Sequence, residues 1–182
     1  MRLVKTHTIL GMRAVTPPFH DGVAAAELPT DLRDWVGEWG LIGLALDAVQ
    51  AEAPGARWAV ETVPENLCAP MMLTLLTYCY AAGIYASEDV EAACDHNAQV
   101  RYICARQYPS GATIRHFRRA NRPLVERCLT RTLTEALKRQ TAEAGRRGQS
   151  NWQPEALEAA RIRELAEYKL QTAVLMDISA DD

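Results

Sequence analysis

Apolar side chains recur every three or four positions along most of this chain, which is the spacing of one face of an α-helix. The first run predicts a helix from about residue 30 to residue 53 that begins with Thr30 as its cap. Trp35 and Trp39 fall on its apolar side, and we expect both in the core. Three glycines interrupt this helix, and each weakens it by up to ~1 kcal/mol. We therefore expect either a close backbone neighbour there or a break near Gly40.

The next predicted helix runs from Pro70 to about residue 82 and is apolar on most sides, so it should lie at the centre of the core. Proline is well accommodated in the first turn of a helix, and Gly83 can end the helix in a left-handed conformation. Ser87 is expected to cap the following helix, whose first turns carry acidic residues at the positive end of the helix dipole. The polar run at 95–97 should end it.

Further helical segments complete the pattern. They cover residues 100–105, a short basic stretch at 113–122, a longer helix after Pro123, and a final helix from Pro154 to about Ile178. We expect an all-α protein: a multi-helix, helix-turn-helix-containing domain with an N-terminal arm and an appended C-terminal helix. The expected parts are the arm at 1–27, a helical DNA-binding domain at 28–144 with its helix-turn-helix at about 87–122, a basic linker at 145–153, and the final helix with an acidic tail at 154–182.

Composition places the chain among ordinary globular proteins, with 182 residues, 48% of them hydrophobic and 24% charged. The first eight residues lack the apolar core of a secretory signal, and no segment is long and apolar enough to span a membrane. We therefore expect a cytoplasmic protein without a membrane partner. The five cysteines are widely spaced and form no Cys-x-x-Cys pair, which favours buried thiols over metal ligands or disulfides.

Motifs of the common hydrolases, nucleotide-binding folds and zinc proteases are absent from the sequence. The acidic residues of the tail, Asp177, Asp181 and Asp182, are interpreted as a solubilising end and not as a metal site. We predict no catalytic residues, metal ligands or cofactors, and we do not expect an enzyme.

Positive charge is concentrated in one part of the sequence. Residues 101–131 contain eight arginines, no lysine and a single acid, Glu126, for a net charge of +7; residues 1–100 carry −8 and residues 132–182 carry −2. Local field strength depends on such clustering and not on the net charge of the whole chain, which is −3. Arginine also binds phosphate and guanine edges through paired hydrogen bonds. This distribution favours a nucleic-acid partner.

The densest basic stretch is the predicted helix at 113–122. At about 100° per residue its four arginines share one arc about 100° wide, and its two large apolar residues point away from that arc. Ser110 can cap this helix, and Pro123 disfavours its continuation. A short, capped helix with a basic face suits the major groove of DNA, whereas an ordinary solvated face would mix charges of both signs. The candidate DNA-binding residues are Arg101, Arg106, Ser110, Thr113, Arg115, His116, Arg118, Arg119 and Arg122.

These residues are expected to contact different parts of the DNA. Arg115, Arg118 and Arg119 would face the groove, where base edges carry the sequence information. The expected phosphate contacts are Thr113, Arg122, Arg101 and Arg106. His116 lies at the edge of the arc, where it either touches phosphate or flanks the face.

The middle of the chain also resembles a known family. Three stretches carry the resemblance in order: a Leu- and Tyr-rich segment with its glycine at 69–87, Val-Arg-Tyr-Ile at 100–103, and Pro-Ser-Gly-Ala-Thr-Ile-Arg-His-Phe-Arg-Arg at 109–119. Together they are similar to the N-terminal helix-turn-helix domain of bacterial insertion-sequence transposases of the DDE class, over about residues 65–140. The resemblance implies a domain that grips double-stranded DNA at a transposon end, followed in that family by a ribonuclease-H-like domain with three metal-binding carboxylates.

The sequence departs from the family pattern at three places. Ser110 replaces the usual aspartate after the motif proline, and Glu88 with Asp89 replaces a basic residue after the preceding turn. The first catalytic aspartate, which the family places soon after residue 140 before Gly-Thr, does not occur here. The resemblance thus implies a truncated, domesticated or regulatory relative that binds DNA without strand transfer.

Other functions remain open. The protein could be an interaction module in which the helix at 154–178 pairs with a second copy, instead of packing back on the domain, or in which the basic face docks an acidic partner. The acidic N-terminal third could also cover the basic face within one chain. RNA binding is less favoured, because no aromatic stacking positions alternate with the arginines.

Overall fold

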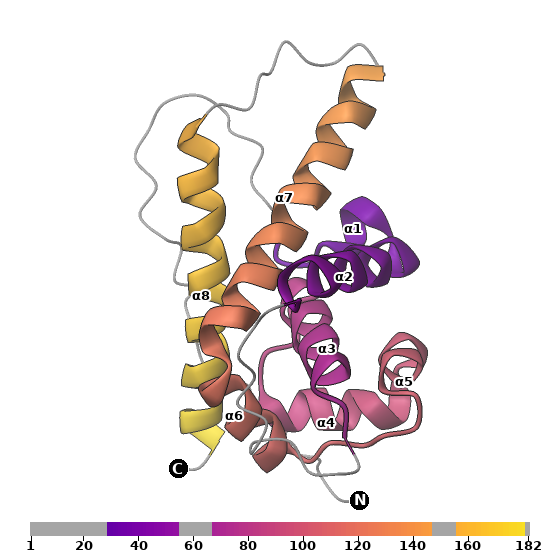
Figure 1. Ribbon diagram of the computed structural model, residues 1–182, viewed down its shortest axis with the longest axis vertical. Coiled ribbons are helices and arrows are strands. Elements are labelled where there is room, and N and C mark those ends of the chain that lie inside the picture. The colour runs from indigo at the N-terminus through magenta and orange to yellow at the C-terminus, as the bar shows by residue number, and fades with distance from the viewer. Residues whose placement is uncertain (1–28, 55–66, 147–155, 181–182) are drawn as a thin grey trace, which may run out of the picture.

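A computed structural model describes residues 29–54, 67–146 and 156–180, and within these ranges the chain forms eight α-helices and no strand (Figure 1). The all-α prediction is confirmed for this part of the chain. The predicted arm at 1–27 and most of the predicted linker lie outside the described residues. The helices are α1 (Arg33–Val36), α2 (Glu38–Glu52), α3 (Ala69–Ala81), α4 (Ser87–His96), α5 (Ala98–Cys104), α6 (Gly111–Ala120), α7 (Arg122–Arg146) and α8 (Ala156–Ala180).

Helix α3 is the centre of the core, as its apolar sequence predicts. Every residue from Met72 to Ala81 is buried, and α2, α5 and α7 all pack against the helix. Pro70 lies in its first turn. Gly83 follows its last turn with a φ of +79°, in the left-handed region where a side chain is strained, so this prediction is confirmed as well.

The first predicted helix is divided, but the break falls at Gly37 and not near Gly40. Gly37 has a φ of +70°, which glycine adopts easily, and its turn separates α1 from α2. Because α2 restarts in a new direction, the spacing that placed Trp39 in the core no longer applies. Trp39 is 61% exposed and Trp35 is only partly buried, so the prediction is wrong for Trp39.

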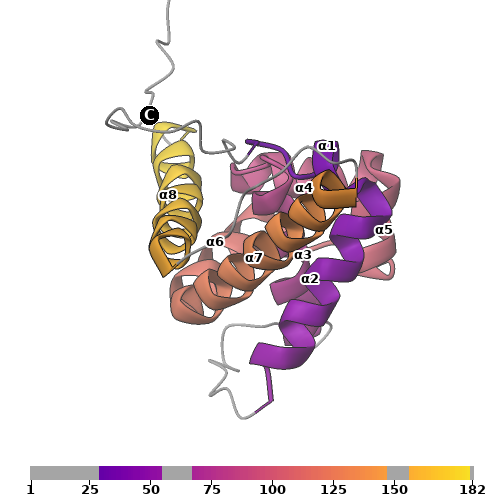
Figure 2. The same ribbon diagram turned by 90° about the horizontal axis from the view of Figure 1, so that it is seen from above.

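Helix α8 packs back on the domain, mainly along α7 and also against α3 (Figure 1). Seen from above, α7 runs between α8 on one side and α2 on the other (Figure 2). The inner face of α8 buries four apolar residues, Ile162, Ala166, Leu170 and Ala173, together with two charged ones, Lys169 and Asp177. This charged pair on a buried face matters for the candidate site.

Four of the five cysteines are buried, which confirms the expectation for all but the exposed Cys68. The Cys94 and Cys104 sulfurs of α4 and α5 lie 3.6 Å apart. Burial raises the pKa of Cys128 to about 12, which is typical of an inert core thiol. None of the described helices has the length and apolar character needed to cross a membrane.

Candidate nucleic-acid interface

The basic helix has the predicted cap, but it spans Gly111–Ala120 and so lies two residues earlier than the predicted 113–122. The Ser110 side chain accepts a hydrogen bond from the Thr113 backbone N–H at 3.3 Å, so the cap is confirmed. Helix α6 ends at Ala120 because Asn121 turns the chain, and the Asn121 side chain donates to the Phe117 carbonyl at 3.1 Å. Arg122 therefore belongs to the first turn of α7.

The solvent-facing side of α6 is not the predicted arginine arc. Its exposed residues are Ala112, His116, Arg119 and Ala120, and its buried ones are Gly111, Ile114, Phe117 and Arg118. At about 100° per residue, the centre of the exposed side lies roughly a quarter turn away from the centre of the predicted arc. The rotation keeps Arg119 and His116 in solvent and turns Arg118 into the protein.

Arg118 is the largest departure from the predicted site. It is 6% exposed, and its guanidinium lies 2.5 Å from a carboxylate oxygen of Asp177. It also donates to the Tyr80 hydroxyl at 3.2 Å and to the Ala173 carbonyl at 3.4 Å. The expectation that Arg118 faces a DNA groove is wrong, because α8 covers this side of α6 and supplies the acid that the guanidinium pairs with.

Asp177 corrects two further expectations. It is buried, not part of a solubilising tail, and it accepts hydrogen bonds from the Ser87 backbone N–H at 2.7 Å and the Ser87 hydroxyl at 2.8 Å. Ser87 thus does not cap α4; Asp177 does so from 90 residues away. Burial raises the pKa of Asp177, but the hydrogen bonds from Ser87 and the charge of Arg118 outweigh it and hold that pKa below its ordinary value.

Acids of α4 meet the beginning of α6. Arg115 forms an ion pair with Glu88, and the Gly111 backbone N–H donates to Glu91 at 2.6 Å. The positive end of α6 and its first arginine are therefore already matched by negative charge. Arg115 remains at the surface, but it is not the unneutralised cation that the sequence suggests.

One acid of the N-terminal third of the chain lies beside two arginines outside the candidate set. Glu52, near the end of α2, lies 3.1 Å from Arg127 and 3.8 Å from Arg131 of α7. Whether the rest of that third covers other arginines depends on residues 1–28 and 55–66, which lie outside the described ranges.

Four arginines of the candidate set keep an open surface. Arg101, Arg106 and Arg119 are exposed and Arg122 is partly exposed, and within the described residues none of the four makes an ion pair. Arg106 has a φ of +69°, directly after Ala105 at +48°. Two successive left-handed residues carry the chain from α5 toward α6 and leave Arg106 in solvent.

Aromatic rings do accompany two of these arginines, contrary to the sequence interpretation. Tyr102 follows Arg101 and is 61% exposed, and Tyr108 follows Arg106 by two residues and is also exposed. The Tyr102 ring contacts the exposed Trp39 ring edge-on, with centroids 5.3 Å apart. Sequence reasoning missed Trp39 here because it placed that residue in the core.

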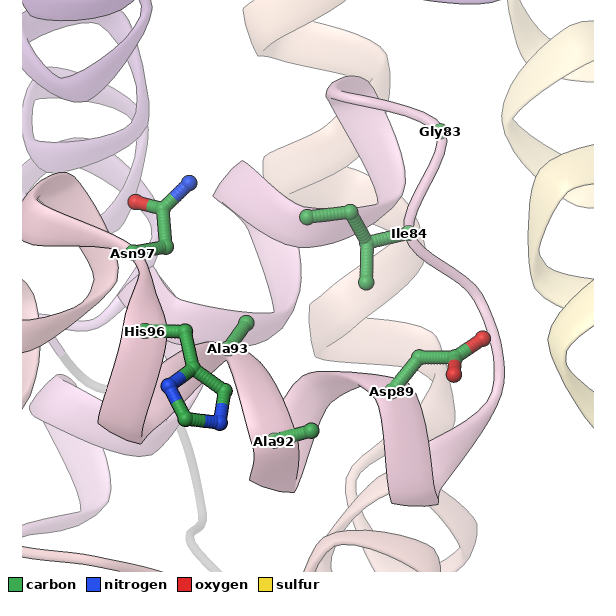
Figure 3. Close-up of a pocket in the computed structure, with 7 residues that line it drawn as sticks. All are labelled: Gly83, Ile84, Asp89, Ala92, Ala93, His96 and Asn97. Atoms are coloured by element: carbon green, nitrogen blue, oxygen red, sulfur yellow. The ribbon is translucent and has the colours of Figure 1, made fainter.

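A shallow hollow of about 470 Å³ lies along α4 and the turn that precedes it, and none of the candidate DNA-binding residues lines it. Figure 3 shows its two ionisable side chains, Asp89 and His96, pointing in different directions. Within the described ranges there is also no group of three or more His, Cys, Asp or Glu side chains placed to hold a metal ion.

Comparison with known proteins agrees with the resemblance in part. Residues 61–120 match the family described as Transposase domain (DUF772), and the match contains α3, α4, α5 and α6. No curated protein and no solved structure matches the chain. The relation to transposases is confirmed over this segment, whereas the helix-turn-helix and the missing catalytic domain stay predictions. Residues 61–120 are thus similar to the transposase domain described as DUF772.

Proposed function

We propose that the protein binds double-stranded DNA through the exposed side of α6 and the start of α7. The observation that carries the proposal is the set of arginines in and beside the transposase domain that lack an intramolecular acid within the described residues. Arg119 and Arg122 lie on consecutive helices, three residues apart, and His116 shares the exposed side of α6 with Arg119. Cations without internal partners are available to phosphate.

Helix α6 is the proposed recognition helix of a helix-turn-helix. It packs on α4, and α5 lies between the two in sequence. Recognition helices commonly read bases with their N-terminal residues, but here Glu88 and Glu91 oppose that end of α6. We therefore assign base contacts to the middle and end of the helix, through His116 and Arg119.

The other candidate residues take supporting roles in this proposal. Ser110, Thr113, Arg101 and Arg106 contact phosphates, and Arg115 does so by exchanging its pairing with Glu88. Arg118 makes no direct groove contact, because it is buried. The proposal concerns binding alone: strands cut or joined when the protein is incubated with Mg²⁺ and a DNA duplex would contradict it.

The decisive experiment compares two double variants that remove the same charge. Arg119→Ala with Arg122→Ala removes arginines that pair with no acid of the described residues, whereas Arg127→Ala with Arg131→Ala removes arginines that both lie beside Glu52. We expect the first variant to bind a DNA duplex more weakly and to lower the slope of log affinity against log salt by about two, roughly one per arginine. The second variant should change that slope much less.

The binding site in DNA is first selected from random duplexes at physiological salt. Circular dichroism of each variant checks that the helices are intact. Equal affinity and equal salt slope for the wild type and the Arg119/Arg122 variant would remove the basis of the proposal.

Self-association is a second candidate, because α8 has an outward apolar side. Tyr168, Leu175, Met176 and Ile178 are exposed on α8 even though its other side is packed on the domain. A second copy could cover these residues. Light scattering across a range of protein concentrations tests the idea. If a second copy binds there, Leu175→Glu should give a smaller measured mass than the wild type at the same concentration.

A further inference from the structure

The carboxylate of Asp177 sits in a compact set of hydrogen-bond donors from two other helices. The Ser87 backbone N–H and hydroxyl approach its two oxygens at 2.7 and 2.8 Å, and the Arg118 guanidinium approaches at 2.5 Å. Ser87 is the first residue of α4, a helix of ten residues, so the backbone donor belongs to the positive end of a helix dipole. We call these three groups of Ser87 and Arg118 the anion cradle.

The anion cradle has the composition of a phosphate site. Helix N-terminal N–H groups, a serine hydroxyl and an arginine are the groups that bind phosphate oxygens in proteins, because all are donors and the guanidinium and the helix end are positive. No donor in the cradle requires a carboxylate in particular. The two oxygens of the Asp177 carboxylate accept hydrogen bonds from all three groups, as two oxygens of a phosphate would.

We infer that the anion cradle is a binding site for a DNA backbone phosphate and that Asp177 occupies it in competition with DNA. The inference rests on the proposed function and adds its regulation. While α8 is docked, the cradle is filled by the protein's own anion. When the end of α8 leaves, Arg118 gains a surface position beside Arg119, and a phosphate takes the place of the carboxylate.

Only the end of α8 has to move for this exchange. Asp177 is the last buried residue of the helix for which burial is described, and its neighbours Leu175, Met176, Ile178 and Ser179 are all exposed. The buried apolar residues of the helix, Ile162, Ala166, Leu170 and Ala173, all precede Asp177 by four residues or more. A helix end fraying over about one turn is a small, local opening.

The exchange adds a third arginine to the proposed DNA-binding surface, beside Arg119 and Arg122. Arg118 precedes Arg119 and lies four residues before Arg122. Figure 1 shows the C-terminal end of α8 near α6 and the beginning of α7, where these arginines are located. Release of one acid therefore converts two open cations into three on adjoining turns.

Two variants that remove the same single negative charge from α8 test the inference. Asp177→Asn weakens the occupant of the anion cradle, whereas Glu164→Gln changes an exposed acid on the same helix. We expect Asp177→Asn to bind the selected DNA about tenfold more tightly than the wild type, the order of factor contributed by one charge-assisted hydrogen bond. Glu164→Gln should bind as the wild type does. Adding Arg118→Gln to Asp177→Asn should abolish the gain.

Hydrogen exchange of the unmodified full chain supplies a readout that needs no variant. On DNA binding, the backbone amides of residues 174–179 should exchange faster, while those around Leu170 stay protected. A parallel sample with inorganic phosphate in place of DNA distinguishes the sources of the anion. If exchange is faster with DNA but not with phosphate, the cradle binds nucleic acid. If exchange is faster with phosphate but not with DNA, the cradle binds a free anion and the regulatory role is overturned.

The possible failures are distinguishable. If Arg119→Ala with Arg122→Ala weakens DNA binding but Asp177→Asn does not strengthen it and the end of α8 stays protected, the competition is refuted and the proposed function stands. If neither the wild type nor Asp177→Asn binds DNA at any salt concentration tested, both fall together. Equal tightening by Glu164→Gln would show a general effect of charge and would also overturn the inference.

Discussion

Replacing Arg118 should destabilise the protein far more than replacing the arginine next to it. Arg118 donates to Asp177, to the Tyr80 hydroxyl and to the Ala173 carbonyl from a position that is 6% exposed. Removal of one partner of a buried ion pair costs about 3–5 kcal/mol, because the other charge stays buried without compensation. Here Asp177 keeps its two hydrogen bonds from Ser87, so we expect Arg118→Ala to cost about 3 kcal/mol, at the lower end.

Urea unfolding followed by circular dichroism measures this cost directly. Arg119→Ala is the matched control, since the residue is exposed and its loss should change the free energy of unfolding by less than about 0.5 kcal/mol. In a double-mutant cycle, Arg118→Ala with Asp177→Ala should cost less than the sum of the single changes, by roughly 1–3 kcal/mol. An Arg118→Ala protein as stable as Arg119→Ala would refute the structural account of this pair. If an Arg118 variant loses DNA binding, its free energy of unfolding must therefore be measured as well, to separate a lost contact from a lost fold.

Three other expectations follow from single residues. Burial lowers the pKa of Lys169 to about 8, below its ordinary value of 10.5. Because the folded protein then binds this proton more weakly than the unfolded chain does, the free energy of unfolding should rise as the pH increases from about 8 to 10.5, by up to about 3 kcal/mol. The difference between the wild type and Lys169→Met isolates this rise from the buried thiols and tyrosines, whose raised pKa values act in the opposite direction; no difference in slope would contradict it. Gly83→Ala should cost about 1 kcal/mol because its φ is +79°, whereas Gly43→Ala, inside α2 with open space around it, should stabilise by about 0.5–1 kcal/mol, and thermal melts would compare them. Trp39→Ala should leave the free energy of unfolding nearly unchanged because the side chain is 61% exposed, and a loss of several kcal/mol would show that Trp39 is a core residue after all.

Local features of the sequence were sufficient for much of the fold. The apolar character of α3, the serine cap of α6 and the left-handed Gly83 each depend on a few neighbouring residues, and each is present in the structure. The break at Gly37 was harder to locate, because three glycines occur at similar spacing and only the tertiary path of the chain selects among them.

The candidate site was less predictable for a physical reason. Arg118 and Arg119 are identical in sequence terms, and what separates them is an acid 59 residues beyond Arg118. The same applies to Glu88 with Arg115 and to Glu52 with Arg127, whose pairings depend on how helices pack. Helical spacing indicates which residues share a face, but it does not indicate which face another helix covers.

The two buried charges of α8 also determine where that helix can sit. Lys169 donates to the carbonyls of Thr30 and Tyr80 and to the Tyr85 hydroxyl, and Asp177 engages Ser87 and Arg118. Eight residues, about 12 Å of helix, separate the two. A slide of α8 by one turn would remove both charges from their partners at once. The spacing of the two charges along the helix therefore matches a single register of α8 on the domain.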